Sequence, residues 1–311
     1  MPSTLSTALL ALLASPPLVA ATCQKYIDAA VTAAANLQSA YFTGGSQQPW
    51  IGAVDSFHLS ELDTLAGVAT YSDVINTVFT AWEGQLDNGD SYDDVQWVSI
   101  AYLRAGNLAQ AQKYYDIAST AVTTNYCGGG LFWNGNDDYK NAITNELYIT
   151  TSGYLYDATK DAQYLTNLQT MFDDGLTNDG LCNNNQGTQW TYNQGTLLPG
   201  LAYLYKCAVN GGLRESCETT TANMCDADQQ TFKGITVHYM SWFLSVSGRD
   251  NDSKYSGFIM AQADNVLEIA VGPTGWYSNL WYGLNGGAAT WTASSQASAL
   301  GALVAAGQQN C

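Results

Sequence analysis

Apolar residues recur along most of this chain at the three- and four-residue spacing that places side chains on one face of an α-helix. The sets that follow this spacing most clearly are Leu59, Leu62, Leu65, Ala66 and Ala69; Val95, Val98, Tyr102 and Ala105; Leu198, Leu201, Ala202 and Tyr205; and Ala297, Leu300 and Val304. The two-residue alternation that is typical of strands is scarce by comparison. The pattern predicts an all-α protein with roughly a dozen helical segments.

Turn-forming stretches separate the helical segments, at residues 88–90, 128–130, 178–180 and 286–287. No low-complexity linker or abrupt change of composition divides the chain, so we expect one domain. A solenoid of helices usually shows a sequence repeat of fixed period, and none is present here. We therefore expect a closed toroid of helical hairpins, in which loops and helix N-termini surround a central cleft at one end.

The N-terminus has the features of a secretory signal peptide. An apolar stretch from Leu5 to Leu13 is followed by Pro16 and Pro17, and small residues at 20–21 offer a cleavage site. The stretch is too short for a transmembrane helix, which needs about 20 apolar residues. We predict a signal peptide at residues 1–21 and one catalytic domain at 22–311. The C-terminal residues lack the hydrophobic tail that precedes a lipid anchor, so we expect a secreted protein of the extracellular space or cell wall, with no membrane anchor.

The seven cysteines, at positions 23, 127, 182, 207, 217, 225 and 311, are expected to be mostly paired in an exported protein, with one thiol left over. Positions 207, 217 and 225 lie close together in the sequence, which predicts at least one local disulfide. There is no CxxC motif and the two histidines are far apart in the sequence, so we expect neither a metal site nor a cofactor. Asn251-Asp252-Ser253 is an N-glycosylation sequon.

The charge balance argues against nucleic acid and anionic membranes as partners. Ten basic residues against 27 acidic ones give a net charge of −17, whereas both of those partners favour clustered Lys and Arg. The 20 Tyr and 9 Trp are mostly expected in the core, but they also suit a cleft that stacks rings against sugars. A neutral polymer is the partner that fits this balance.

Three Asp-Asp pairs, at 93–94, 137–138 and 173–174, are candidates for chemistry. Glycoside hydrolysis commonly uses two carboxyl groups, about 5–5.5 Å apart in retaining enzymes. Adjacent residues have Cα atoms about 3.8 Å apart, so their side chains can reach that separation at a helix end, but they diverge in mid-helix. The pair at 173–174 reads as a helix C-terminus entering a turn, and the pair at 137–138 as part of a polar loop.

Asp93 and Asp94 differ because an apolar-periodic helix begins directly after them. The residues from Ser91 to Asp94 fit a capping box, with Ser91 as N-cap and Asp94 at the third helical position, and on this pattern alone the structural role comes first. A helix N-terminus also lowers the pKa of carboxylates, which suits a nucleophile. A general acid at Asp94 would need burial or a negative neighbour, such as ionised Asp93, to raise its pKa.

Four segments together resemble glycoside hydrolase family 76, the α-1,6-mannanases and their fungal cell-wall relatives. They are Tyr92-Asp-Asp-Val-Gln-Trp97, Cys127-Gly-Gly-Gly-Leu-Phe-Trp133, Tyr139-Lys-Asn-Ala-Ile-Thr-Asn145 and Trp190-Thr-Tyr-Asn-Gln-Gly195. Weaker similarity extends from Trp50 to Phe232-Lys-Gly234 and to the segment 294–306. Two departures from the family pattern concern the subsites: Trp50 is followed by Ile51 instead of a second aromatic residue, and no arginine follows Gly234.

The resemblance implies an (α/α)6 barrel and a retaining mechanism. By it, Asp93 is the nucleophile that forms a mannosyl-enzyme intermediate, and Asp94 is the general acid and then the base. The residues it suggests for sugar subsites are Trp133, Asn145, Trp190, Tyr192 and Asn193. For the two tryptophans, packing in the barrel wall explains the pattern nearly as well, and for Lys140 and Asn141 a solvated loop does. Cys127 lies inside a family motif and is a candidate for the unpaired thiol.

Three functions follow. The first is a monomeric, secreted endo-acting hydrolase of α-1,6-mannan. The second is a transglycosidase of the same family that moves mannan-bearing anchors into a fungal wall, and the missing anchor tail favours the hydrolase over it. The third is a glycan-binding protein without turnover, which the presence of both carboxylates disfavours.

Overall fold

The structure is a computed structural model that describes residues 21–44, 49–82, 84, 86, 89–123, 130–136, 139–172, 211–215, 217–218, 225–248, 253–283 and 291–309. Within these residues the α-helices are α1 (Ala21–Gly44), α2 (Pro49–Ala66), α3 (Ser72–Trp82), α4 (Tyr92–Arg104), α5 (Leu108–Ser119), α6 (Ala142–Thr159), α7 (Ala162–Phe172), α10 (Phe232–Val246), α11 (Ser253–Glu268) and α12 (Ala293–Gly307). A 3-10 turn, η2 (Pro273–Gly275), and two isolated β-bridges complete the described secondary structure.

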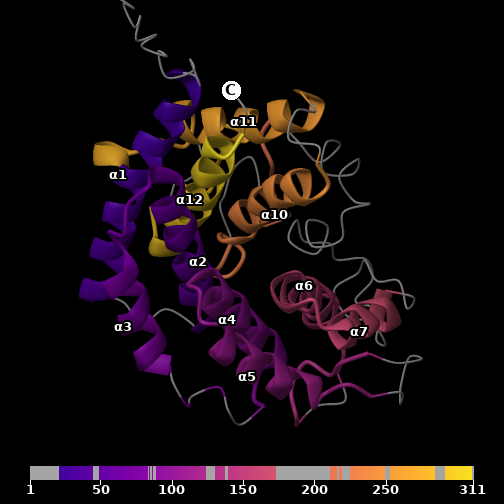
Figure 1. The fold of residues 1–311 in the computed structure, drawn as a ribbon. Coiled ribbons are helices and arrows are strands. Elements are labelled where there is room, and N and C mark those ends of the chain that lie inside the picture. Colours follow the sequence, from indigo (N-terminus) through magenta and orange to yellow (C-terminus); the bar gives the residue numbers. More distant parts are fainter. Residues whose placement is uncertain are drawn as a thin grey trace, which may run out of the picture.

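The helices alternate between an inner and an outer position (Figure 1). The inner helix α4 packs against α2 and α6, and the inner helix α12 packs against α2 and α10. Outside them, α3 covers α2, α5 covers α4, α7 covers α6, and α1 and α11 both cover α12. This alternation of inner and outer helices is the arrangement of the predicted (α/α)6 barrel.

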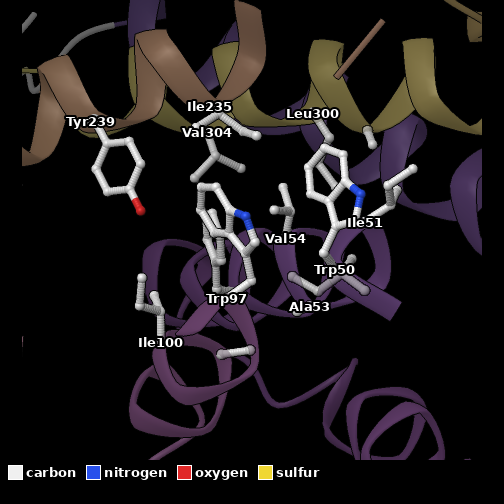
Figure 2. Close-up of a cluster of buried hydrophobic side chains, with 14 of the residues drawn as sticks. Trp50, Ile51, Ala53, Val54, Trp97, Ile100, Ile235, Tyr239, Leu300 and Val304 are labelled. Carbon is white, nitrogen blue, oxygen red and sulfur yellow. The ribbon is translucent and has the colours of Figure 1, made fainter. Parts of the chain in front are cut away.

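The interior between the inner helices is filled by large aromatic and aliphatic side chains. Figure 2 shows Trp50 of α2 and Trp97 of α4 facing Leu300 and Val304 of α12, and Trp97 also faces Tyr239 of α10. The ring centroids of Trp50 and Trp97 are 6.0 Å apart, and Trp97 is only 2% exposed. Burial of side chains of this size supplies much of the free energy of folding, at about 25 cal/mol per Å² of apolar surface.

Helix α12 is buried on every side from Ser294 to Gly307, and its small residues allow neighbouring helices to approach it closely. A Cβ at Gly234 of α10 would clash with the backbone of Ser298, and a Cβ at Gly301 would lie 2.6 Å from the His58 ring of α2. The closest helix contacts in the barrel therefore require glycine on α10 and on α12.

Three of the four predicted helical sets and three of the seven cysteines lie within the described residues. Helix α2 ends at Ala66, so Ala69 lies beyond it, α4 ends one residue before Ala105, and the set 297–304 lies inside α12. The set 198–205 lies outside the described residues. The predicted local disulfide is confirmed as Cys217–Cys225, and Cys23 is also disulfide-bonded. Cys127, Cys182, Cys207 and Cys311 lie outside the described residues.

Residues 1–20 of the predicted signal peptide also lie outside the described residues, and Ala21 begins α1. In the part of the chain that the structure describes, none of the helices has the length and apolar character needed to cross a membrane.

Replacement of Gly234 by Ala should destabilise the barrel, because the added methyl group has to push α10 away from α12. We expect the free energy of unfolding to fall by about 1–3 kcal/mol, as is usual for overpacking. Gly257→Ala on α11 is the matched control, since nothing lies within 4 Å of the added Cβ there and helix propensity should raise stability by about 0.5–1 kcal/mol. Chemical unfolding of both variants measures the difference, and equal stability of the two would contradict the close packing of α10 on α12.

Candidate active site

The N-terminal ends of the inner helices α2, α4, α6 and α10 meet around one small pocket. Its lining residues come from the first two turns of these helices and from the turn before α10, and they are Trp50, Asp93, Trp97, Ile143, Asp228 and Phe232. The pocket has a volume of about 70 Å³. It gives water, or the reacting part of a larger ligand, access to the Asp93 carboxyl group.

Hydrogen bonds hold the Asp93 carboxyl group in place. The Ser91 hydroxyl donates to Asp93 Oδ1 at 2.6 Å, and the indole N–H of Trp133 donates to the same carboxyl group. Trp133 is held beside α4 because the Tyr92 N–H donates to the Trp133 carbonyl at 2.8 Å and the Gly135 N–H donates to the Gly89 carbonyl at 2.9 Å. Two loops that are distant in the sequence are thereby joined at this carboxyl group.

The capping-box interpretation of this segment is wrong. Ser91 occupies the N-cap position with an extended backbone, but its side chain makes no capping hydrogen bond, because the hydroxyl donates to Asp93 instead. The segment therefore uses its N-cap serine to orient a carboxyl group.

The expectation that the helix N-terminus lowers the pKa of Asp93 also needs correction. Burial raises this pKa above its ordinary value, while hydrogen bonds from Ser91, from the backbone N–H groups of Asp93 and Asp94 and from Trp133 oppose the rise. The donors around Asp93 favour its ionised form, so within the pair it is the carboxyl group better suited to carry the charge.

Asp94 lies in the opposite electrostatic environment. Burial raises the pKa of Asp94 well above its ordinary value, the negative charge of Asp93 raises it further, and Asp228 adds to the effect. The nearby Ser91 hydroxyl, which donates its hydrogen to Asp93, has a smaller influence in the opposite direction on the pKa of Asp94. Two adjacent, enclosed carboxyl groups do not readily carry two charges, and their surroundings favour the proton on Asp94 over Asp93.

Asp228 is a third carboxyl group at this pocket, and it was not among the residues predicted from the sequence. Burial raises its pKa to about 6, with further increases from the charges of Asp226 and Asp93, while a hydrogen bond from the Trp50 indole lowers it. The available signal was its position four residues before Phe232, in a segment already noted for family similarity.

A buried ion pair anchors the start of α10 beside Asp228. Lys233 Nζ lies 2.5 Å from Glu218 Oε1, and both side chains are fully buried. The Asn279 side chain donates to the same carboxylate oxygen at 2.8 Å, and the Lys233 ammonium also donates to the Asn279 carbonyl. The Cys217–Cys225 disulfide closes the segment that carries Glu218, so the segment before α10 is fixed at both ends.

Two of the five predicted sugar-binding residues, Trp133 and Asn145, lie within the described residues. Trp133 is partly exposed and hydrogen-bonds to Asp93, so it reaches the pocket. The structure does not support a sugar-binding role for Asn145. Its side chain has no exposed surface, and its amide binds backbone groups of Leu131 and Asn141 at 2.7–3.1 Å. It positions the Trp133 segment instead of contacting a ligand. Trp190, Tyr192 and Asn193 lie outside the described residues.

The solvated-loop interpretation of Lys140 and Asn141 is also wrong. Lys140 has no exposed surface and its ammonium lies 5.2 Å from the centre of the Phe132 ring. Asn141 is the N-cap of α6 and accepts a hydrogen bond from the Thr144 N–H. The other acidic pairs, at 137–138 and 173–174, lie outside the described residues.

Metal-ligating side chains do not gather anywhere in the described part of the chain in groups of three or more. The two histidines that are far apart in the sequence do meet, with ring centroids 5.1 Å apart, in the barrel interior.

Replacement of Asp228 by Asn should stabilise the protein at neutral pH. A buried carboxyl group with a raised pKa favours its protonated form in the folded state. The destabilisation of the fold by ionised Asp228 is therefore absent below its unfolded pKa of about 4 and grows as the pH rises to 6. We expect a gain of about 1 kcal/mol at pH 7.5, reduced for partial exposure, and none at about pH 4. Thermal unfolding across this range measures it, with the exposed Asp116→Asn as control. A gain that is equal at both pH values would contradict the environment assigned to Asp228.

Comparison with known proteins identifies the family of this chain. The family model for Glycosyl hydrolase family 76 matches residues 25–212, which is more than half of the chain. Among curated proteins, the mannan endo-1,6-alpha-mannosidase DFG5 of Saccharomyces cerevisiae is 25% identical over 256 residues, covering 64% of this chain and 56% of that protein. DCW1 of the same yeast, with the same enzyme name, is 24% identical over 230 residues, covering 58% and 50%. The chain thus spans about half the length of the curated relatives it matches.

Solved structures show the same fold. Dfg5 from Chaetomium thermophilum in complex with glucosamine has a TM-score of 0.74 at 18% identity, covering 92% of this chain and 90% of that one. A second solved structure with this fold is an inactive variant of the alpha-1,6-mannanase GH76A of Salegentibacter sp. HEL1_6, in which two consecutive aspartates are replaced by asparagine. It is in complex with alpha-1,6-mannotriose and has a TM-score of 0.72 at 17% identity, covering 91% and 99%. These likenesses confirm the (α/α)6 barrel, and with the family match they establish that the chain belongs to glycosyl hydrolase family 76.

Proposed function

We propose that this protein is a secreted, endo-acting glycoside hydrolase that cleaves α-1,6-mannosidic bonds with retention of configuration. The observation that carries the proposal is the unequal environment of the adjacent Asp93 and Asp94 at the N-terminus of α4. Several hydrogen-bond donors favour charge on Asp93, while burial and two negative neighbours favour a proton on Asp94. A retaining glycosidase needs this difference between its two carboxyl groups.

Two comparisons support mannan as the substrate. The fungal relatives are named mannan endo-1,6-alpha-mannosidases, and the barrel is similar to an alpha-1,6-mannanase whose inactive variant lacks two consecutive aspartates and binds alpha-1,6-mannotriose. Asp93 and Asp94 are the consecutive aspartates at the mouth of the present barrel. The Cys217–Cys225 disulfide supports export, because disulfides persist in oxidising compartments.

In the first step, an Asp93 oxygen attacks the anomeric carbon of the mannose unit while Asp94 gives its proton to the glycosidic oxygen, whose bond to that carbon breaks. The products of this step are a mannosyl ester of Asp93 and a shortened mannan with a free hydroxyl group. Hydrogen bonds from Ser91 and Trp133 fix the attacking carboxylate so that its orientation costs little on substrate binding.

In the second step, ionised Asp94 takes a proton from water, and the water oxygen attacks the same carbon and displaces Asp93. Two displacements restore the original configuration. As Asp93 regains its charge, the pKa of Asp94 rises again and favours the protonated acid for the next cycle. The charge of Asp228 also raises the pKa of Asp94 and so favours the protonated acid that the first step needs.

Variants of the two aspartates should fail in different ways. Asp93→Ala and Asp94→Ala should each lower mannan cleavage by about a thousandfold or more. With an aryl α-1,6-mannobioside, whose leaving group needs no proton, Asp94→Ala should still form the mannosyl-enzyme, and added azide should then yield the α-glycosyl azide. Asp93→Ala with azide should yield the β-product instead, because only one displacement occurs.

The same assays are applied to Asp228→Asn and to an exposed control, Asp116→Asn. Wild-type cleavage of mannan by Asp93→Asn and by Asp94→Asn would show that the catalytic assignment is wrong. Release of the β-anomer by the wild-type enzyme, followed by NMR during the first turnovers, would exclude the retaining mechanism.

Transglycosylation is the second candidate function, because the same two carboxyl groups can serve it. It uses the same mannosyl-enzyme, which a sugar hydroxyl intercepts in place of water. Product analysis with an added acceptor separates the two: longer mannan species indicate transfer, and only shorter ones indicate hydrolysis. A glycan-binding protein without turnover would bind mannan and form neither.

A further inference from the structure

A second cavity lies at the end of the barrel opposite to the aspartates. The inner helices that begin at the active site end here, and the cavity of about 370 Å³ is lined by residues from their last turns. They are Glu61 and Leu65 of α2, Arg104 of α4, Ser241, Trp242 and Ser245 of α10, and Gln308 just after α12. A volume of this size is within the range of small-ligand sites, and five times larger than the 70 Å³ pocket beside Asp93.

The charges that line this cavity cancel. Arg104 Nε lies 3.5 Å from Glu61 Oε1, and their side chains are 25% and 12% exposed. His238 lies behind them, with Nδ1 3.3 Å from Glu61 Oε2, and burial together with the charge of Arg104 lowers its pKa to about 3, so it is neutral at physiological pH. One positive and one negative charge leave the lining neutral. An anion therefore gains little here, all the more because the whole chain carries a net charge of −17.

Polar contacts hold the lining groups in a fixed arrangement. The Gln308 amide donates to Glu61 Oε2 at 2.9 Å and accepts from the Ser241 hydroxyl at 2.9 Å, and the Gln309 amide donates to Ser241 at 2.7 Å. Ser245 is exposed at the same face. The wall of the cavity thus combines a guanidinium donor, carboxylate acceptors and hydroxyl groups that can do both.

An aromatic ring completes the wall. Trp242 is partly exposed, and its ring lies 4.5 Å from the Tyr154 ring in an edge-to-face contact. The Arg104 guanidinium lies 4.5 Å from the centre of the same Tyr154 ring. Tyr154 thereby fixes both the indole and the cation.

We propose that this cavity, between Arg104, Glu61 and Trp242, is a second glycan-binding site that takes a neutral hexose unit. A pyranose has an apolar face that suits an indole, and vicinal hydroxyl groups that accept from a guanidinium and donate to a carboxylate. The choice of an α-mannan as the glycan rests on the proposed function, whereas the choice of a neutral polyhydroxyl ligand rests on the lining alone. A site at this end would hold a polymer on the enzyme without occupying the catalytic end.

The alternative is that Arg104 and Glu61 serve only to tie α4 to α2. The test therefore leaves this ion pair intact and fills the cavity instead. Ser245→Trp places a bulky ring inside it from an exposed position, and Val246→Trp is the matched control, because residue 246 is 62% exposed on the same helix and does not line the cavity. Thermal unfolding checks that both variants are folded.

The measurement is calorimetric titration of α-1,6-mannotriose into the full chain carrying Asp93→Asn and Asp94→Asn, which prevents turnover. We expect two sites in this background and with Val246→Trp, and one site with Ser245→Trp, where affinity at the second site falls by about tenfold or more. A single site that Ser245→Trp removes would support this cavity and count against the proposed function.

Equal binding by the Ser245→Trp and Val246→Trp proteins, or the absence of any binding, would overturn the second site. Inorganic phosphate is the anionic probe, and phosphate binding that Ser245→Trp abolishes and that exceeds mannotriose binding would overturn the assigned ligand class.

Discussion

Helix α12 packs against α1, α2, α10 and α11 at once, and it can do so because its side chains are small and buried on every side. Gly234 of α10 lies against the Ser298 backbone, and Gly301 lies against the His58 ring of α2. These contacts fix α10 relative to α2. They thereby set the distance across the barrel between the residues at the start of those two helices, Trp50 on one side and Phe232 on the other, whose ring centroids are 6.4 Å apart.

The chemistry of the pocket beside Asp93 depends on that spacing. Asp228 precedes α10 and Asp93 begins α4, so only a closed ring of helices brings both to one pocket. Burial is unfavourable for every carboxylate there, and the local donors decide which of them bears the charge. Ser91 and Trp133 are directed to Asp93 and the Trp50 indole is directed to Asp228, so the proton is favoured on Asp94.

The two ends of the inner helices also differ in a way that follows from the helix itself. A helix N-terminus favours negative groups and a C-terminus favours positive ones. Helix α4 follows this rule, with Asp93 and Asp94 in its first turn and Arg104 in its last. Between these ends lie the packed rings of Trp97 and Tyr239, with centroids 6.2 Å apart, which separate the acidic end from the neutral, polar cavity at the other end (Figure 2).

The sequence by itself determined the helical class, because the apolar spacing of a helix is a local property. It also singled out Asp93 and Asp94 as candidates, through four motifs in order, and predicted a local disulfide among Cys207, Cys217 and Cys225, which the structure shows as Cys217–Cys225. It did not reveal that Ser91 binds Asp93 instead of capping α4, that Asn145 is fully buried, or that Asp228 reaches the same pocket. Only the tertiary structure decided these points, because each depends on which groups from distant segments surround a side chain and on how far water is excluded from it.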